Sequence, residues 1–385
     1  MIKRTIQKRM EERLFKGKII ILYGARRVGK TTIAKSITAK HKNSRYINCE
    51  LLQNKTALET TNSNLLKTFL GNYRLIVLDE AQHIENISLI LKILVDTFPD
   101  MQIIATGSSG FELGQKVSEP LTGRARRFML YPFSFKELQN HTDNITLHAQ
   151  LENMLRFGLY PEVFNQPESE AIEQLYEITN NYLFKDVLQF ERLKRSDLLT
   201  NLLQAIALQL GSEISYNELA NMLGVSVHTI KRYIDLLEKT FAIFRLPSYS
   251  RNPRKEISKS QKIYFWDIGI RNALIQNFNK FSLRNDTGAL WENFCIAERI
   301  KANQNKGNYA KTFFWRTYQK NEIDYIEEKD DKISAFEFKY NPRKKTPKPA
   351  MFLKLYPDAD YKVINNENFM YEFLGIPEFG NDLDN

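Results

Sequence analysis

The residues best suited to chemistry lie near the N-terminus, in the run Gly24-Ala25-Arg26-Arg27-Val28-Gly29-Lys30-Thr31-Thr32. Two glycines with four residues between them, followed by Lys-Thr, have the spacing of a P-loop. The glycines let the backbone curl so that its N–H groups point at phosphate oxygens, and the N-terminus of the following helix adds partial positive charge. We predict that this run binds a nucleoside triphosphate, with Lys30 at the β- and γ-phosphates and the Thr31 hydroxyl on Mg²⁺. The alternative is a Gly-rich turn that arose by chance.

Asp79 and Glu80 form a second candidate group, directly after the apolar run Leu75-Ile76-Val77-Leu78. Four apolar residues in succession are typical of a buried strand, and they bring the two carboxylates to its carboxyl end. We expect Asp79 to bind the Mg²⁺ through water and Glu80 to polarise an attacking water. The alternative is a charged strand end that faces solvent.

The elements around these groups are expected to form a parallel sheet. Apolar, β-branched residues 18–23 predict a buried strand before the loop, and residues 30–40 predict the helix after it. Further strand-like runs follow, at residues 45–48, 75–79, 102–106 and 128–131, with helical stretches between them. Such alternation indicates an α/β domain whose parallel sheet is covered on both faces. We assign residues 1–140 to this P-loop ATPase domain.

The middle of the chain contains two further predicted parts. Apolar residues recur at helical spacing in residues 141–205, which predicts a helical lid or linker. Residues 206–272 predict a winged helix-turn-helix, with a capping box that starts at Ser215, a turn at Gly224, a longer helix and two strand-like runs. We expect this part to dock DNA through basic side chains on the second helix and on the loop between the strands. These are His228, Lys231, Arg232, Arg251, Arg254 and Lys255. The alternative is the solvated face of a structural joint.

Residues 273–385 carry a second candidate active site on a predicted hairpin. With Asp330-Asp331 as a two-residue turn, counting inward places Asp324 opposite Glu337. Two carboxylates that face each other on one side of a sheet repel, and a bound divalent metal removes that repulsion. The alternative is a register shifted by one residue, which would send Asp324 to the other face.

Lys339 lies two residues after Glu337, so both side chains project from one face of the strand. A lysine beside a metal can polarise a water or a scissile phosphate. This arrangement with Asp324 resembles the active site of restriction-endonuclease-like nucleases, where Glu292, on a preceding helix, would be an additional metal-binding acid. The resemblance implies a restriction-endonuclease-like α/β domain with a candidate second Mg²⁺ or Mn²⁺. The alternative is chance, since Glu-x-Lys is a common sequence.

Composition narrows the classes of protein. The chain has 385 residues, of which 43% are hydrophobic and 26% charged, as in ordinary globular proteins of two or three domains. No apolar run approaches the length of a membrane span and the N-terminus lacks the apolar core of a signal peptide, so we expect a cytoplasmic protein without a membrane partner. Cys49 and Cys295 have no metal-binding or disulfide spacing. A net charge of +10 is compatible with a polyanionic partner such as DNA.

The motifs in this order resemble those of bacterial and archaeal AAA-family ATPases that carry a C-terminal DUF4143 domain. The resemblance covers nearly the whole chain. It rests on the P-loop with its two arginines and on the further runs Leu78-Asp79-Glu80-Ala81-Gln82, Ala105-Thr106-Gly107-Ser108-Ser109, Leu121-Thr122-Gly123-Arg124, Tyr131-Pro132-Phe133-Ser134-Phe135, Gly158-Leu159-Tyr160-Pro161-Glu162, Trp291-Glu292-Asn293-Phe294 and Glu337-Phe338-Lys339.

The resemblance implies ATP as the nucleotide and an ASCE-type sheet, in which the sensor strand lies between the two Walker strands. It implies that Ser108 or Ser109 occupies the sensor-1 position near the γ-phosphate. Arg124 is then the candidate arginine finger, acting in cis or from a neighbouring subunit of a homo-oligomer, with Arg126 and Arg127 as rivals. A lid arginine of the sensor-2 kind is not found, which puts a hexameric ring in doubt and leaves a monomer, or a dimer that switches with nucleotide, as the alternative.

Together these features predict a Mg²⁺-dependent ATPase that couples ATP turnover to DNA binding or processing. The alternative is an ATP-controlled regulatory or signalling switch, whose winged helix and C-terminal domain bind protein and whose nuclease-like fold is inactive. A third alternative is an ATP-driven remodeller of proteins, against which the lack of a recognisable pore loop counts.

Overall fold

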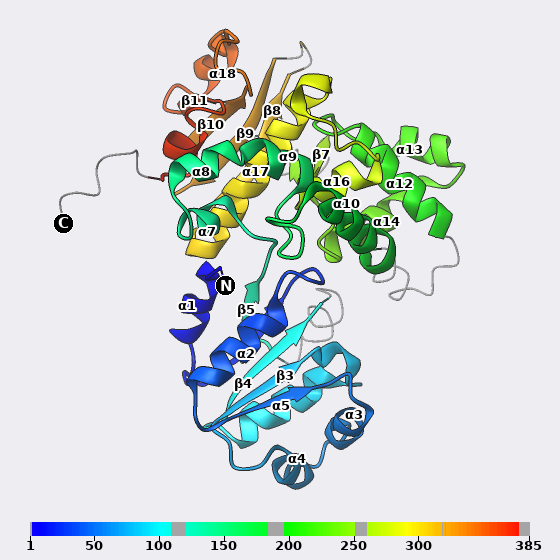
Figure 1. The fold of residues 1–385 in the computed structure, drawn as a ribbon, viewed down its shortest axis with the longest axis vertical. Helices are drawn as coiled ribbons and strands as arrows, with labels where there is room; N and C mark the ends of the chain where they lie inside the picture. The colour runs from blue at the N-terminus through cyan, green and yellow to red at the C-terminus, as the bar shows by residue number, and fades with distance from the viewer. Residues whose placement is uncertain are drawn as a thin grey trace, which may run out of the picture. The chain divides into compact units, whose positions relative to one another are not determined.

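The structure is a computed structural model and describes residues 2–108, 121–183, 196–250, 260–317, 319 and 321–376. The chain divides into two compact units (Figure 1). The described residues up to Phe133, together with Lys239–Phe241, form the first unit, and the other described residues form the second.

A five-stranded sheet forms the centre of the first unit. Its strands are β1 (Ile19–Tyr23), β2 (Ser44–Asn48), β3 (Leu75–Asp79), β4 (Gln102–Gly107) and β5 (Ala125–Met129). They lie in the order β2-β3-β4-β1-β5, and every neighbouring pair is parallel. The strand that precedes Ser108 therefore lies between the P-loop strand and the strand that ends at Asp79. The predicted α/β fold class is confirmed.

Helices cover both faces of this sheet. They are α1 (Thr5–Glu11), α2 (Lys30–Lys40), α3 (Leu52–Leu58), α4 (Ser63–Leu70), the 3-10 helix η1 (Ala81–His83) and α5 (Ile87–Thr97). Alternate strand residues such as Ile76 and Leu78 share one hydrophobic cluster with α3, α4 and α5. Helix α2 contacts β2, β3 and β4, and its buried Ile33 and Ile37 lie outside that cluster, so α2 covers the opposite face. Burial on both faces explains why β1 and β3 are continuous apolar runs.

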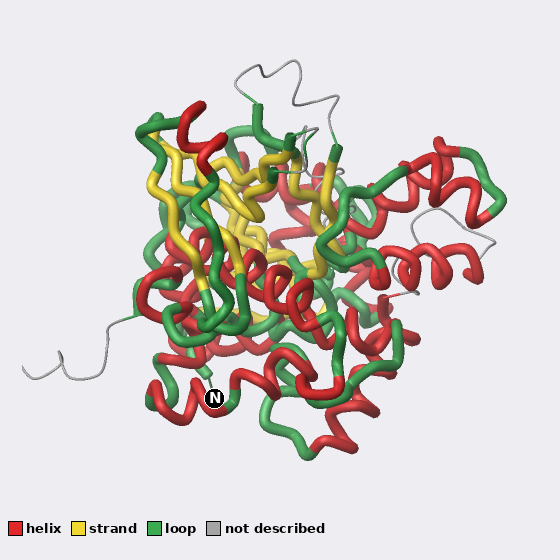
Figure 2. The backbone as a smooth tube through the Cα atoms, turned by 90° about the horizontal axis from the view of Figure 1, so that it is seen from above, coloured by secondary structure: helices red, strands yellow, loops and turns green. Residues whose placement is uncertain are grey.

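The second unit begins with helices. The helical elements of this unit are α7 (Phe135–Gln139), α8 (Asn144–Ala149), α9 (Leu151–Phe157), α10 (Glu168–Glu177), η2 (Ile178–Leu183), α12 (Ser196–Leu208), α13 (Tyr216–Leu223), α14 (Val227–Lys239), α16 (Ile268–Leu274), η3 (Phe281–Leu283), α17 (Thr287–Lys306), α18 (Ala350–Leu355) and η4 (Phe369–Phe373). A capping box opens α7, because the side chains of Ser134 and Glu137 each accept the other's backbone N–H. Figure 2 distinguishes these helices, in red, from the strands, in yellow.

A tight turn joins α13 to α14. It begins at Gly224, whose φ of 63° lies in the left-handed region that favours glycine. After α14 come two antiparallel strands, β6 (Ile243–Pro247) and β7 (Gln261–Phe265). Glu213, before α13, forms an isolated antiparallel bridge with Lys262 of β7. The predicted DNA-contacting residues between the two strands, Arg251, Arg254 and Lys255, lie outside the described residues.

A second sheet contains the predicted hairpin. Its strands are β8 (Lys311–Arg316), β9 (Glu322–Lys329), β10 (Lys332–Phe338) and β11 (Asp360–Ile364), in the order β11-β10-β9-β8. Strands β10 and β11 are parallel and the other pairs are antiparallel. Asp330 and Asp331 form the turn, with φ of 51° and 60°, and Lys329 pairs with Lys332. The predicted two-residue turn and its register are therefore confirmed.

Helix α17 contacts both β7 and β10. Asp286 immediately precedes this helix, and its carboxylate pairs with Arg271 at 2.5 Å and with Arg284 at 2.8 Å. Burial alone would raise the pKa of this carboxyl, but the hydrogen bonds and charges of the two guanidinium groups outweigh it and lower the pKa to about 2.

Candidate nucleotide site and acidic cluster

The P-loop lies at the carboxyl end of β1 and has a shape that requires its glycines. Gly24 directly follows β1, and a Cβ at this position would lie 2.1 Å from the carbonyl oxygen of Leu130. Gly29 has a φ of 99° and immediately precedes α2. The backbone N–H groups of the first turn of α2 have no partner within the helix. The sequence thus builds a loop whose donors are presented to an anion.

Lys30 is held inside this loop. Its side chain is buried, and its Nζ donates to the carbonyl oxygens of Gly24 at 3.1 Å and Ala25 at 2.7 Å. A long, buried ammonium within the loop is well placed to exchange these carbonyls for phosphate oxygens, which bind an ammonium more strongly because they are charged.

Asp79 is the centre of a hydrogen-bond network at the carboxyl end of β3. Its side chain is buried, and one oxygen accepts from the hydroxyl of Thr31 at 2.8 Å. The hydroxyls of Tyr46 and Thr106 also donate to this carboxylate. The structure therefore brings together the two residues that sequence reasoning assigned to one Mg²⁺. Tyr46 and Thr106 were missed, since only the order of the strands shows that β2 and β4 flank β3.

Glu80 lies beside this network in a strained backbone conformation. Its φ of 54° and ψ of 44° are left-handed, and its backbone N–H donates to the hydroxyl of Thr106 at 3.0 Å. The amide Nε2 of Gln82 donates to the Glu80 carboxylate and, at 3.1 Å, to the hydroxyl of Ser108. Glu80 and Ser108 are thus connected through Gln82, for which sequence reasoning had no role. Ser109 lies outside the described residues.

The negative charge of this site changes the pKa values of neighbouring side chains. Burial and then the charges of Asp79 and Glu80 raise the pKa of the Cys49 thiol to about 12. Burial and the hydrogen bond to Asp79 likewise raise the pKa of the Tyr46 hydroxyl. Cys49 is therefore a protonated, buried thiol at neutral pH. The site as a whole favours a cation.

Arg124 does not lie near the P-loop. Its carbonyl oxygen accepts from the N–H of Ile19, at the amino end of β1, and its side chain pairs with Asp96 at 2.7 Å. Because β1 and β5 are parallel, Arg124 is separated from the P-loop by the length of a five-residue strand, about 16 Å. The predicted role as an arginine finger in cis is therefore corrected, while the role in trans stays a prediction. The rivals Arg126 and Arg127 lie within β5.

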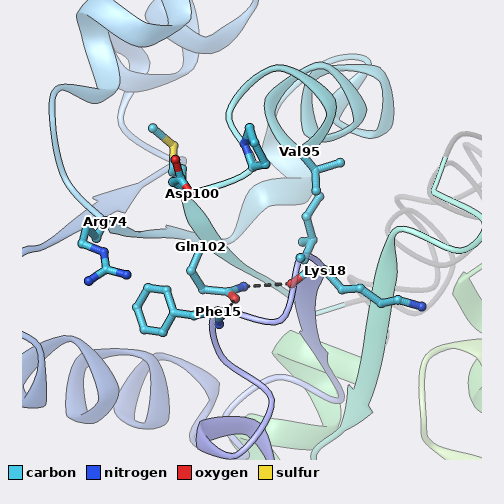
Figure 3. A pocket seen from close by; sticks show the side chains of 10 residues that line it. Phe15, Lys18, Arg74, Val95, Asp100 and Gln102 are labelled. Atoms are coloured by element: carbon cyan, nitrogen blue, oxygen red, sulfur yellow. Dashed lines mark hydrogen bonds between the residues drawn. The ribbon is translucent and has the colours of Figure 1, made fainter.

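A cavity of about 90 Å³ lies at the same amino-terminal edge of the sheet (Figure 3). Gln102 spans it, with its Nε2 donating to the Lys18 carbonyl at 3.0 Å and its Oε1 accepting from the Phe15 N–H at 2.6 Å. The guanidinium of Arg74 lies 5.1 Å from the centre of the Phe15 ring. These residues precede or begin β1, β3 and β4, so this cavity is distinct from the P-loop site, which follows the strands' carboxyl ends.

The predicted DNA-contacting residues of the second helix are exposed on α14. They are His228, Lys231 and Arg232. The apolar residues Ile230, Tyr233 and Ile234 face the interior. The Lys231 ammonium lies 5.6 Å from the centre of the Tyr216 ring on α13. The exposed face is therefore basic.

Four carboxylates of the second unit form what we call the acidic cluster: Glu292, Glu322, Asp324 and Glu337. Asp324 is buried, and its Oδ2 accepts from the Phe338 N–H at 2.8 Å. The Glu337 carboxylate pairs with Lys339 at 2.6 Å. Burial, and then the charges of Glu292 and Glu337, raise the pKa of Asp324 well above its usual range. The residues predicted from the hairpin register thus share one region.

Lysine occupies part of the acidic cluster, which sequence reasoning did not foresee. Lys262 of β7 pairs with Glu292 at 2.9 Å and with Glu322 at 2.5 Å, and the Tyr264 hydroxyl also donates to Glu292. Glu292 therefore binds β7 in this structure rather than acting with Asp324 and Glu337. Among the described residues, no group of three or more His, Cys, Asp or Glu could hold a metal ion, so the predicted second metal is not supported.

No helix within the described ranges is both long and apolar enough to cross a bilayer.

Three family models match consecutive parts of the chain. An AAA domain matches residues 16–139, a domain of unknown function (DUF8612) matches residues 148–280, and a second domain of unknown function (DUF4143) matches residues 287–377.

Curated relatives come from archaea and bacteria. An uncharacterized protein of Methanocaldococcus jannaschii is 29% identical over 67% of this chain, and the chain spans 63% of that protein's length. An uncharacterized protein of Mycobacterium tuberculosis is 26% identical over 88% of this chain and 74% of its own.

Similar solved structures include the Pif1 helicase from Candida albicans, with 15% identity, a TM-score of 0.26 and coverage of 47% of this chain and 48% of that one. The Hsp104-ADP complex of S. cerevisiae has 12% identity, a TM-score of 0.28 and coverage of 79% and 43%. By the family models, the chain therefore contains an AAA domain, followed by a C-terminal DUF4143 domain.

Proposed function

We propose that this chain hydrolyses ATP at the P-loop and couples turnover to DNA binding. The observation that carries the ATPase proposal is the contact between Thr31 and Asp79, 2.8 Å apart, beside the buried Lys30. A hydroxyl and a carboxylate are hard oxygen donors, so they fit Mg²⁺ together with phosphate oxygens. When bound, Mg²⁺ would neutralise charge on the β- and γ-phosphates.

The residues of the chain then have distinct roles. Lys30 and the first turn of α2 bind the phosphates and orient them. Glu80 accepts a hydrogen bond from the attacking water, and Gln82 holds the Glu80 carboxylate toward Ser108. Ser108 is the sensor-1 residue, since it lies at the end of the strand between the two Walker strands.

The test of the ATPase proposal separates binding from turnover. We expect Glu80→Gln to bind ATP with unchanged affinity and to lose turnover by about 10²–10⁴-fold, because the variant retains shape but cannot act as a base. Glu85→Gln, an exposed glutamate five residues later, is the matched control and should turn over normally. Normal turnover by Glu80→Gln would remove Glu80 from this role.

We propose that residues 206–272 act as a winged helix that docks DNA. Two observations support this proposal. The elements follow in the order α12, α13, α14, β6 and β7, as expected of a winged helix, and Glu213 forms a bridge with Lys262 where its short first strand would lie. The exposed face of α14 carries His228, Lys231 and Arg232, and the net charge of +10 favours a polyanion.

The salt dependence of binding tests this docking. Each phosphate contact contributes about −0.9 to the slope of log K against log [salt]. The variant with alanine at His228, Lys231 and Arg232 should therefore bind duplex DNA more weakly, with a slope shallower by about 2. Lys332→Ala, at an exposed lysine of β10, is the control and should leave the slope unchanged. An unaltered slope in the triple variant would refute docking through α14.

A second candidate function is an ATP-controlled switch whose nuclease-like fold is inactive. The observation that favours it is the ion pair of Lys262 with Glu292 in the acidic cluster. Under this alternative, DNA neither binds in a salt-sensitive manner nor stimulates ATP turnover. The same titrations therefore distinguish the two candidates.

A further inference from the structure

Lys262 of β7 is buried among groups from three other elements. Only 1% of its side chain is exposed. Its Nζ lies 2.9 Å from a carboxylate oxygen of Glu292 on α17 and 2.5 Å from one of Glu322 on β9, and 5.4 Å from the centre of the Phe314 ring. An ammonium stays buried where carboxylates and hydrogen bonds replace its water. The surroundings of Lys262 are therefore those of a bound cation.

The metal that a restriction-endonuclease-like fold implies does not fit this cluster. A divalent metal needs several free oxygen donors, and Mg²⁺ requires near-octahedral geometry. Each carboxylate of the cluster already has partners within the chain. Asp324 accepts from the Phe338 N–H, and Glu337 pairs with Lys339. Glu292 contacts Lys262 and Tyr264, and Glu322 pairs with Lys262 and Arg316. Across the part of the chain that is described, no set of three acidic, His or Cys side chains is arranged to hold a metal.

We propose that Lys262 is a built-in cation that takes the place of a divalent metal in the acidic cluster. The carboxylates of this cluster then hold a strand of the chain, β7, instead of a catalytic ion. The ammonium and a metal would require the same oxygens of Glu292, and two cations so close together repel each other. Lys262 has the advantage because it is tethered, which gives it a high effective concentration at the cluster.

The same contact has a mechanical consequence. Lys262 belongs to the β6–β7 ladder, whereas Glu322 belongs to the C-terminal sheet, and Ser248 after β6 bridges in parallel to Phe314 of β8. The acidic cluster therefore ties the proposed winged helix to the DUF4143 domain. This inference goes beyond ATP hydrolysis and does not depend on it.

Binding of Mn²⁺ to the full-length protein without nucleotide tests the proposal, with free Mn²⁺ measured by electron paramagnetic resonance. All variants carry Asp79→Asn, so that the P-loop site contributes no uptake. We expect the Asp79→Asn protein and its Lys332→Met control to take up no Mn²⁺ at the acidic cluster. Lys262→Met is nearly the same length without the charge, and it should gain one Mn²⁺ per chain that is lost again when Asp324→Asn is added.

Two results would overturn the proposal. One is uptake by the Asp79→Asn protein itself that Asp324→Asn abolishes, because the cluster would then hold a metal with Lys262 present. The other is a folded Lys262→Met variant, with an unchanged circular dichroism spectrum, that gains no Mn²⁺. If Lys262→Met does not fold, the comparison of Asp79→Asn with and without Asp324→Asn still decides, since it leaves Lys262 intact. ATP turnover is read separately, so its failure does not affect this result.

Discussion

Removal of the Arg4 side chain is expected to weaken both the first unit and its nucleotide site. Arg4 is buried just before α1, and its Nη1 donates to the carbonyl oxygen of Val28 in the P-loop at 2.7 Å. Its Nη2 donates to the carbonyl oxygen of Tyr131, after β5, at 2.6 Å. The guanidinium also lies 4.9 Å from the centre of the Phe133 ring. A single side chain thus joins the P-loop to the end of the neighbouring strand.

The magnitude follows from these contacts. Arg4→Ala leaves the carbonyl oxygens of Val28 and Tyr131 without this donor, at about 1–3 kcal/mol for each buried acceptor. The expected loss is therefore about 2–6 kcal/mol in the free energy of unfolding, toward the lower end if water enters the space. About 1.4 kcal/mol corresponds to a tenfold change in Kd. If at least that much of the loss reaches the P-loop, ATP binding is expected to weaken by about tenfold or more.

The assay combines denaturant unfolding with titration of a fluorescent ATP analogue. Lys8→Ala, at an exposed position on α1, is the matched control and should change the free energy of unfolding by less than about 0.5 kcal/mol. Arg4→Lys should be intermediate, because an ammonium lacks the planar fork that reaches both carbonyls. Arg4→Ala that unfolds and binds ATP like Lys8→Ala would refute the reasoning.

Three further predictions concern single residues. Gly24→Ala should abolish ATP binding, because its Cβ would lie 2.1 Å from the carbonyl oxygen of Leu130 and the loop must move; retained affinity in a titration would contradict the loop geometry. Arg124→Ala should leave turnover per chain unchanged in dilute, monomeric protein, and a loss there would restore a role in cis; a loss that appears only as concentration rises would indicate a finger in trans. Asp286 has a pKa lowered to about 2 in the folded state, so its charge stabilises the fold above the unfolded value of about 4, and this stabilisation is lost as pH falls toward 2. Asp286→Asn should therefore remove up to about 2 kcal/mol of stability at neutral pH, and less where solvent screens the half-buried group. In this variant, the free energy of unfolding should depend less on pH between pH 4 and 2.

Much of the architecture could be predicted because it depends on neighbours in sequence. The apolar runs before Gly24 and before Asp79 form strands that are buried on both faces. A short, continuous apolar run of this kind is typical of a strand in a parallel sheet. The hairpin register followed from a two-residue turn at Asp330-Asp331, since a turn of fixed length sets every pair behind it. The capping box at Ser134 is likewise a contact across three residues.

The sequence by itself therefore determined the P-loop, the strands around it and the pairing of Asp324 with the strand of Glu337. Only the tertiary structure decided which partners these groups meet. Arg124 lies far from the P-loop. Strands β1 and β5 are parallel, so Arg124 is at the edge of the sheet opposite the P-loop. Glu292 meets Lys262 rather than a metal, since β7 passes beside α17 and β9. Residues far apart in sequence carry no local signal of each other, so their contacts are set by how the sheets and helices pack.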